Sequence, residues 1–315
     1  MKTGIALSGG GDKGAFTVGA LNALIDRGET FDMIAGTSTG ALIAPLLAIK
    51  AMKPLNAVYG NVNKSDILSN KPLYAGLITG TGFYGVGPLR EIVEKTITES
   101  MYQRIMDSKV EIFICTVCLS NMQPIYWTNS ETKSTSSNYD IYYWRNREEM
   151  IDAIMASCCQ PVLMPNQYIH DEPYVDGGLR NFLPIDILID NDADKITAIL
   201  TTTGKRYYDS KKFKTIDTLM KTIEIFSRDV AEQDLKWAEF YNQQARAIQN
   251  AIERLVQQGV RQEIAAGIFS AFPGNYKRII NLEVIRPYKE LGDGLTFDSD
   301  AMKQMIQLGY QSVNL

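Results

Sequence analysis

The chain has 315 residues, of which 45% are hydrophobic and 22% charged, and its formal net charge is −4. This composition is ordinary for a globular protein, and the length permits one large domain or two smaller ones. The charge gives no hint of nucleic-acid binding, which usually needs a basic surface. No stretch is long and apolar enough to span a bilayer, and strand-like sequence begins too early for a signal peptide. We therefore expect a cytoplasmic protein that does not bind nucleic acid.

The first half of the chain alternates strand and helix patterns. Strands are predicted at 4–7, 31–35 and 110–118, and helices at 14–26, 39–50 and 88–106. The helix at 14–26, for example, carries an apolar stripe that includes Val18, Leu21 and Leu24. Alternation of this kind predicts an α/β fold with a mainly parallel sheet.

The first predicted strand runs directly into the glycine-rich stretch GGGDKG. Gly9, Gly11 and Gly14 fit G-x-G-x-x-G, the fingerprint of a dinucleotide-binding turn. That interpretation needs an acidic residue at the carboxyl end of the second strand, to hold a ribose. Asp32 has nearly the right separation but lies at the start of that strand. We therefore expect the loop to approach something other than a nucleotide.

The second strand leads into Gly36-Thr-Ser-Thr-Gly40, which fits G-x-S-x-G between a strand and an apolar helix. In that context the pattern predicts a tight turn that exposes a nucleophilic serine, here Ser38, with Gly36 and Gly40 permitting the turn. The free N–H groups and the positive dipole end of the following helix point at the same place.

A glycine loop beside a nucleophilic serine suits acyl transfer, in which negative charge develops on a carbonyl oxygen. The loop lies at the carboxyl end of the strand next to the turn. We predict an oxyanion hole made by the backbone N–H groups of Gly10, Gly11 and Thr39. Lys13 is expected to add positive charge there.

Four cysteines invite a metal or redox interpretation. Cys115 and Cys118 form C-x-x-C, but they lie within the apolar strand at 110–118. An offset of three on a strand points two side chains to opposite faces, which is poor geometry for one shared site. Cys158 and Cys159 are adjacent. We expect four buried, reduced thiols and no metal.

The second half of the chain also contains predicted strands and helices. Strands are predicted around 125–127, 141–144, 195–200 and 278–285, a helix at 148–157, and an almost entirely helical block at 215–270. We interpret the block as a cap-like segment within a single domain of residues 1–315. Its apolar side chains form core or shape an acyl pocket: Met220, Ile223, Phe226, Trp237, Phe240 and Tyr241.

A serine nucleophile needs a base, and the chain has one histidine. His170 lies in a polar run typical of a solvated loop, so a conventional triad is not favoured. Six residues later comes Asp176-Gly177-Gly178, after a short apolar segment. Desolvation would make the Asp176 carboxylate a stronger base, and a direct hydrogen bond to Ser38 would place it for proton transfer.

The ordered set GGGDKG, GTSTG and DGG resembles the patatin-like phospholipases. Ala156-Ser157-Cys-Cys-Gln-Pro161 and the closing Leu308-Gly309-Tyr310 are also similar to that family. The resemblance implies a three-layer α/β/α fold and hydrolysis of lipid acyl esters without a cofactor. Ser38 would attack and Asp176 would act as base. Supporting positions would be Gly9, Lys13, Gly14, Gly36, Gly40 and Gly177.

The expected partner is a lipid or another acyl ester. Residues 204–221 combine basic and aromatic side chains, which suits either peripheral contact with anionic headgroups at a membrane surface or a plain solvated loop. Two other functions remain open: an acyltransferase that uses the same residues with an acceptor other than water, and a nucleotide-binding module that uses the glycine loop.

Overall fold

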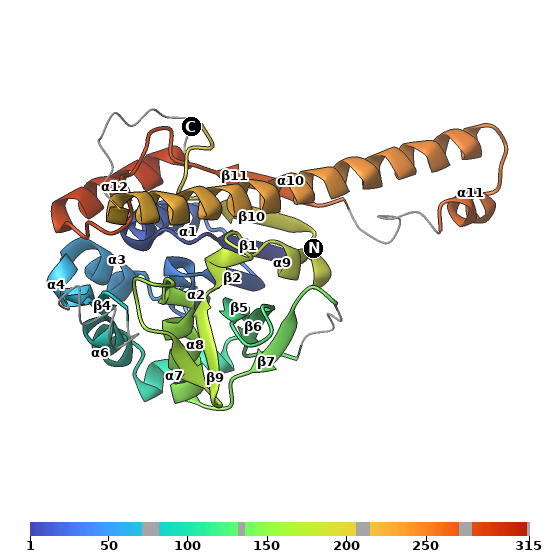
Figure 1. Cartoon of the computed structure of the whole chain (residues 1–315). Helices are drawn as coiled ribbons and strands as arrows, with labels where there is room; N and C mark the ends of the chain where they lie inside the picture. The colour runs from blue at the N-terminus through green and yellow to red at the C-terminus, as the bar shows by residue number, and fades with distance from the viewer. Residues whose placement is uncertain (71–81, 132–135, 206–214, 271–278, 314–315) are drawn as a thin grey trace.

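The computed structural model describes residues 1–70, 82–131, 136–205, 215–270 and 279–313 (Figure 1). Its centre is a sheet in the order β11-β10-β1-β2-β5-β6-β7, with β9 added to β5 and β8 to β9. These strands are β1 (Thr3–Leu7), β2 (Met33–Thr37), β5 (Glu111–Cys118), β6 (Pro124–Thr128), β7 (Asp140–Tyr143), β8 (Gln167–Ile169), β9 (Glu172–Asp176), β10 (Lys195–Ile199) and β11 (Asn281–Ile285). A separate pair joins β3 (Ser69–Asn70) to β4 (Tyr84–Gly85).

The five strands from β11 to β5 pair in parallel, whereas β6 and β9 run antiparallel to β5. Helices cover both faces (Figure 1). They are α1 (Gly14–Asp26), α2 (Thr39–Ala48), α3 (Met52–Asn61), α4 (Lys64–Ile67), α6 (Gly87–Thr96), α7 (Glu99–Asp107), α8 (Arg147–Cys158), α9 (Asp186–Asp190), α10 (Thr215–Gln257), α11 (Gln262–Ile268) and α12 (Ser299–Ser312), with 3₁₀ turns η1 (Gly11–Lys13) and η2 (Gly177–Leu179).

Side chains alternate between two hydrophobic cores along each central strand, as a sheet covered on both faces requires. On β1, Ile5 and Leu7 belong to the core under α1, α2, α8 and α12, while Ala6 belongs to the core under α9 and α10. The predicted α/β architecture with a mainly parallel sheet between helices is confirmed.

The same alternation separates the two strand cysteines. Cys118 packs in the first core and Cys115 in the second. All four cysteines are buried and free.

Two local expectations were wrong. The single helix expected at 88–106 is two helices, because Thr98 has an extended backbone and its side chain accepts a hydrogen bond from the Met101 N–H at 3.3 Å, which starts α7. The polar run before Asp176 is the hairpin β8–β9 rather than a loop.

The helical block is dominated by α10, a helix of 43 residues and therefore roughly 65 Å long. Near its middle it packs on the sheet through Ala231, Leu235 and Ala238. Its second half projects beyond the sheet, and α11 packs against its far end (Figure 1). In the part of the chain that the structure describes, no helix is long and apolar enough to cross a membrane.

Candidate active site

Two strands meet end to end along one edge of β5, and this meeting creates the site. The parallel partner β2 ends with Thr37 opposite Cys115, and the antiparallel partner β9 ends with Asp176 opposite Thr116. Ser38, the next residue after β2, is therefore brought against Asp176. Two residues that are 138 positions apart share one site because both strands use the same neighbour.

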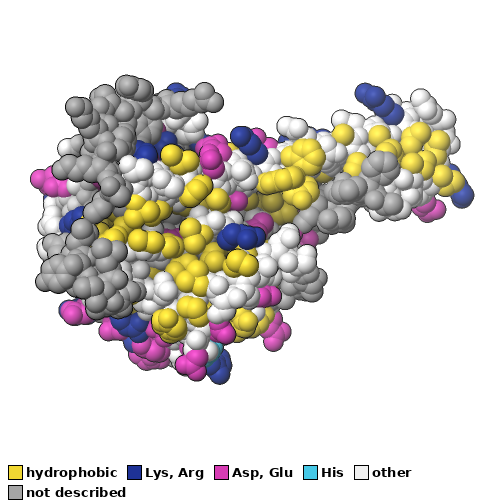
Figure 2. Space-filling model, viewed as in Figure 1, with side chains coloured by type: hydrophobic (Ala, Val, Ile, Leu, Met, Phe, Trp, Pro, Cys, Tyr) yellow, Lys and Arg dark blue, Asp and Glu magenta, His cyan; other side chains and the backbone are white. Residues whose placement is uncertain are grey.

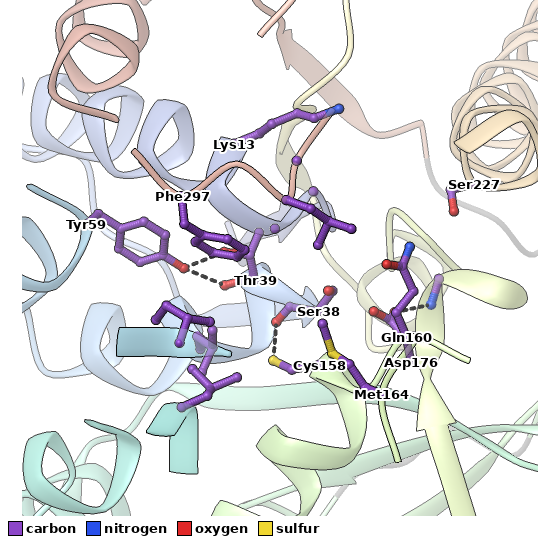
Figure 3. Close-up of a pocket in the computed structure, with 18 of the residues that line it drawn as sticks. Lys13, Ser38, Thr39, Tyr59, Cys158, Gln160, Met164, Asp176, Ser227 and Phe297 are labelled. Atoms are coloured by element: carbon purple, nitrogen blue, oxygen red, sulfur yellow. Dashed lines mark hydrogen bonds between the residues drawn. The ribbon is translucent and has the colours of Figure 1, made fainter. Parts of the chain in front are cut away.

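Ser38 sits on a strained turn. Its backbone lies at φ 56° and ψ −120°, a conformation that is rare for a residue with a side chain. The Ser38 N–H donates to Ser157 Oγ at 2.9 Å, and that hydroxyl donates to the Cys115 carbonyl oxygen at 2.6 Å. The Cys158 thiol donates to the Ser38 carbonyl oxygen at 3.3 Å (Figure 3). Both ends of the Ser38 peptide are thus held by the end of α8.

The predicted glycines of the turn are needed for close packing. A Cβ on Gly36 would lie 2.3 Å from the Gly40 carbonyl oxygen, and one on Gly40 would lie 2.3 Å from that of Leu7. Gly177 and Gly14 are similarly crowded, by the Cys115 carbonyl oxygen and by the Thr39 hydroxyl. These positions shape the turn and bring neighbouring segments close to it.

The carboxyl of Asp176 is buried, with 8% of the residue exposed. It accepts a hydrogen bond from the Gly178 N–H at 2.8 Å and interacts with the Ser38 side chain. Burial raises its pKa to about 6, although the Gly178 N–H and the Ser38 hydroxyl both act to lower it. A carboxylate with this pKa is ionised at neutral pH and is a stronger base than an exposed aspartate.

The glycine loop lies beside this pair. Leu7 at the end of β1 is paired with Gly36, so the residues after β1 reach the Ser38 turn. Gly9 is fixed by its N–H, which donates to the Phe182 carbonyl oxygen at 3.2 Å, and by its carbonyl oxygen, which accepts from Thr201 Oγ1 at 2.6 Å. Gly11 has φ 61°, and a Cβ there would lie 1.9 Å from the Gly294 carbonyl oxygen, so only glycine fits.

Three backbone donors remain available around Ser38. Among the described residues, no acceptor pairs with the N–H groups of Gly10, Gly11 or Thr39. All three residues line the same cavity as Ser38 and Asp176. This is the arrangement expected of an oxyanion hole.

Lys13 does not extend toward the serine. Its side chain is almost fully buried, and its amino group lies away from Ser38 in Figure 3. Burial lowers its pKa, while the carboxylate of Glu224 on α10 acts in the opposite direction. The expectation that Lys13 supplies charge at the oxyanion is therefore not supported by its position. Sequence reasoning missed Glu224 because it is more than 200 residues away along the chain.

A cavity of about 450 Å³ opens from Ser38 into the core under α2, which is a typical size for a ligand site. An aliphatic part of its lining comes from four helices: Leu42 and Leu46 on α2, Leu55 and Val58 on α3, Leu89, Ile92 and Val93 on α6, and Ile223 on α10. Charged side chains, among them Lys221, Glu224 and Arg228 at the start of α10, line another part. The aliphatic part of the cavity is suited to an acyl chain whose carbonyl group would lie beside Ser38.

Several lining residues carried no signal in the sequence. Phe297 and Met302 come from the C-terminal segment, and the Phe297 N–H donates to Asp12 Oδ2 at 2.9 Å, which ties that segment to the glycine loop. Tyr59 is hydrogen bonded to the Thr39 hydroxyl (Figure 3). These contacts depend on the tertiary fold alone.

Core and acyl pocket were the two alternatives for the apolar side chains of the helical block, and three of the six named fit neither. Of its apolar side chains, Ile223 lines the cavity, whereas Phe226, Trp237 and Phe240 are exposed. The reason is the helix face, because these three side chains lie roughly opposite the buried Ala231, Leu235 and Ala238 through which α10 packs on the sheet. Most of the basic segment 204–221 and the side chain of Met220 lie outside the described residues.

His170 is remote from Ser38. It occupies the turn between β8 and β9, where its imidazole contacts Glu149 and Arg145 at 3.1 and 2.6 Å and is more than half exposed. Asp176 is at the opposite end of β9, a strand that spans roughly 13 Å from Glu172 to Asp176.

Asp32 is similarly misplaced for a nucleotide site. It precedes β2 at the amino end of the sheet, and its carboxylate accepts from the Thr3 N–H at 2.7 Å. It is not available to hold a ribose beside the glycine loop.

A family model described as patatin-like phospholipase matches residues 5–189. The chain is 28% identical over 194 residues to a cGAMP-activated phospholipase of Escherichia coli (strain TW11681), covering 56% of this chain and 51% of that protein. It is 24% identical over 204 residues to Lysophospholipase NTE1 of Mycosarcoma maydis (63% and 10%) and 26% identical over 196 residues to an omega-hydroxyceramide transacylase of Mus musculus (59% and 29%). Each alignment thus spans about half or less of the relative's length. Among solved structures, VipD from Legionella pneumophila aligns with a TM-score of 0.47 and 13% identity, over 99% of this chain and 66% of VipD.

Proposed function

The chain belongs to the patatin-like phospholipase family, and from this premise we propose that it hydrolyses carboxylic esters of lipids through an acyl-enzyme on Ser38. The proposed substrates are phospholipids, lysophospholipids or neutral glycerolipids. The observation that carries the proposal is the interaction of the Ser38 hydroxyl with the buried Asp176 carboxyl. In this scheme the chain works as one domain, and the start of α10 closes one side of the cavity.

In the first half of the reaction, the acyl chain occupies the aliphatic part of the cavity with its carbonyl carbon next to Ser38 Oγ. Asp176 takes the hydroxyl proton as Oγ attacks that carbon. The N–H groups of Gly10, Gly11 and Thr39 bind the resulting oxyanion. The intermediate collapses as the alcohol leaves with the proton from Asp176, and the acyl group remains on Ser38.

The second half repeats these steps with water. Asp176 removes a proton from the water that attacks the acyl-enzyme, the same donors bind the second oxyanion, and Ser38 regains the proton as the fatty acid leaves. One carboxyl serves both as base and as acid, which suits a pKa of about 6.

Three variants test this assignment with a soluble chromogenic ester. Ser38→Ala and Asp176→Asn should each lower kcat/KM by at least about a thousandfold, because nucleophile and base act as a unit. His170→Ala is the control and should keep most of the activity, since the imidazole lies at the β8–β9 turn against Arg145, Glu149 and Trp127, away from Ser38. Loss of activity in the folded His170 variant would overturn the Ser38–Asp176 assignment.

Acyl transfer to an alcohol is a second candidate, supported by the similarity to an omega-hydroxyceramide transacylase. The acyl-enzyme is the same in both reactions, and only the acceptor differs. Product analysis with and without an added long-chain alcohol distinguishes them. A new ester formed at the expense of free fatty acid would identify a transferase.

Lipid substrates of this kind are held in membranes or droplets, so we also propose transient contact with a lipid surface. The basic segment 204–221 is one candidate for that contact. Its contribution is tested by neutralising its lysines and measuring binding to anionic vesicles.

A further inference from the structure

The side of α10 that faces away from the sheet exposes three large aromatic side chains. Phe226, Trp237 and Phe240 are 61%, 56% and 46% exposed. At 100° per residue they fall within a sector of about 60°, roughly opposite the buried Ala231, Leu235 and Ala238. We call these three residues the aromatic stripe. The rings of Trp237 and Phe240 also contact each other edge to face, with centroids 5.8 Å apart.

The stripe begins at the rim of the cavity. Ile223 and Ser227, on either side of Phe226 in the sequence, both line the cavity, and so does Leu179, which is 40% exposed. Phe240 is 13 residues beyond Ser227, which places it roughly 20 Å farther along the helix. Figure 2 shows hydrophobic side chains over the body and along α10 on the same face of the molecule.

We propose that the aromatic stripe docks the chain on a lipid surface by inserting its aromatic side chains, so that the cavity rim meets the lipid. This inference rests on the proposed function, because a lipid surface is the source of substrate for an acyl cavity. Tryptophan and phenylalanine suit this role, since rings enter the boundary between headgroups and acyl chains.

The exposed area favours a lipid surface over a second copy of the chain. A large aromatic side chain presents about 200 Å², so the half-exposed stripe offers on the order of 300 Å². A stable protein interface needs about 800 Å² from each partner. A lipid surface is fluid and needs neither this minimum area nor a matching shape. It can also contact the stripe and the cavity rim at the same time.

The proposal predicts binding that does not depend on attraction between opposite charges. The stripe is uncharged and the chain has a net charge of −4, so phosphatidylcholine vesicles should bind and added salt should have little effect. A dominant role of the basic segment 204–221 would instead require anionic lipid and would be weakened by salt.

Intrinsic fluorescence provides a direct readout. Of the three tryptophans, Trp127 and Trp144 are buried, at 1% and 3% exposed, whereas Trp237 is exposed. Titration of the full chain with phosphatidylcholine vesicles should shift the emission to the blue because Trp237 leaves water. The shift should be lost in Trp237→Phe.

The decisive variant is Phe226→Ser combined with Phe240→Ser, neither of which lines the cavity. Vesicle co-sedimentation should fall by about tenfold or more, while hydrolysis of a soluble short-chain ester stays unchanged. Tyr168→Ser is the matched control, because Tyr168 is a 69% exposed aromatic on β8, and its binding should equal that of the wild type.

Unchanged vesicle binding in the double variant, or no binding by the wild type, would overturn the proposal. A wild-type dimer in light scattering that becomes monomeric in the double variant would instead identify the stripe as a protein interface. Binding by Ser38→Ala separates the two proposals: it should match the wild type even if no hydrolysis is detected, so docking is measured independently of the proposed function.

Discussion

The buried Asp176 carboxyl interacts with one backbone N–H and one hydroxyl. Burial and these two donors act on its pKa in opposite directions. Burial raises its pKa to about 6 against the two hydrogen-bond donors. The carboxyl must be ionised to accept the Ser38 proton. The rate of the proposed reaction should therefore follow the fraction of Asp176 that is ionised.

We predict that kcat/KM for a neutral soluble ester falls as the pH drops through about 6, and by tenfold per unit below that. The reason is that protonated Asp176 cannot act as base. A rate profile from pH 4.5 to 8 measures this limb, with circular dichroism as a control for folding. A limb near pH 4, the range of an exposed aspartate, would mean that Asp176 is not desolvated or is not the base.

At the residue scale, the sequence was most informative where a motif is local. Ser38 is marked by its flanking glycines and by the strand and helix around it, and Asp176 by the family resemblance. The surroundings of Lys13 were not predictable, because the charged side chains of Glu224 and Arg228 that act on it are distant in the chain.

Among the elements, the end of α8 holds the Ser38 turn. Ser157 Oγ accepts from the Ser38 N–H and donates to the Cys115 carbonyl oxygen, so one hydroxyl joins three segments. The sequence placed Ser157 in a family-like segment without indicating this contact.

We predict that Ser157→Ala lowers the free energy of unfolding by about 1–3 kcal/mol, because it leaves buried polar groups unpaired. It should also lower kcat, since the strained Ser38 backbone loses its support. Urea unfolding and ester hydrolysis measure the two effects. Ser108→Ala is a matched control that removes a hydroxyl bonded only to the end of α7, and its kcat should be unchanged. An unchanged kcat in Ser157→Ala would contradict the supporting role.

The ends of helices and strands could be predicted from apolar periodicity in some places and not in others. The helix α1 begins and ends where its apolar stripe predicted, at Gly14 and Asp26. The break between α6 and α7 depends on a single capping threonine, and the strand β9 depends on pairing with β5, which is distant in sequence. Local periodicity contains neither kind of information.

On the scale of the whole molecule, the cavity is formed jointly by segments that are distant in the sequence, and no single segment predicts it. Its lining runs from Gly10 to Met302 and joins α2, α3 and α6 to the start of α10, where Ile223 packs against the same core as these helices. The sequence predicted the layers of the fold but not this space, because a cavity is defined by what distant segments leave unfilled.

We predict that Val93→Phe shortens the acyl chain that the cavity accepts. Val93 lines the cavity on α6 and is 4% exposed, so a larger side chain must occupy the space. kcat/KM for a long-chain ester should fall by about tenfold or more, while that for a butyryl ester changes little. Val256→Phe, on the exposed end of α10, is the control. Equal losses for both esters would show that acyl chains bind elsewhere.

The most direct test of the central claim is the site of covalent labelling by a fluorophosphonate, located by peptide mass spectrometry. Ser227 also lines the cavity and provides an internal comparison (Figure 3). The adduct should lie on Ser38, disappear in Ser38→Ala, persist in Ser227→Ala and form slowly in Asp176→Asn. An adduct on Ser227, or ester hydrolysis that survives in Ser38→Ala, would contradict the account.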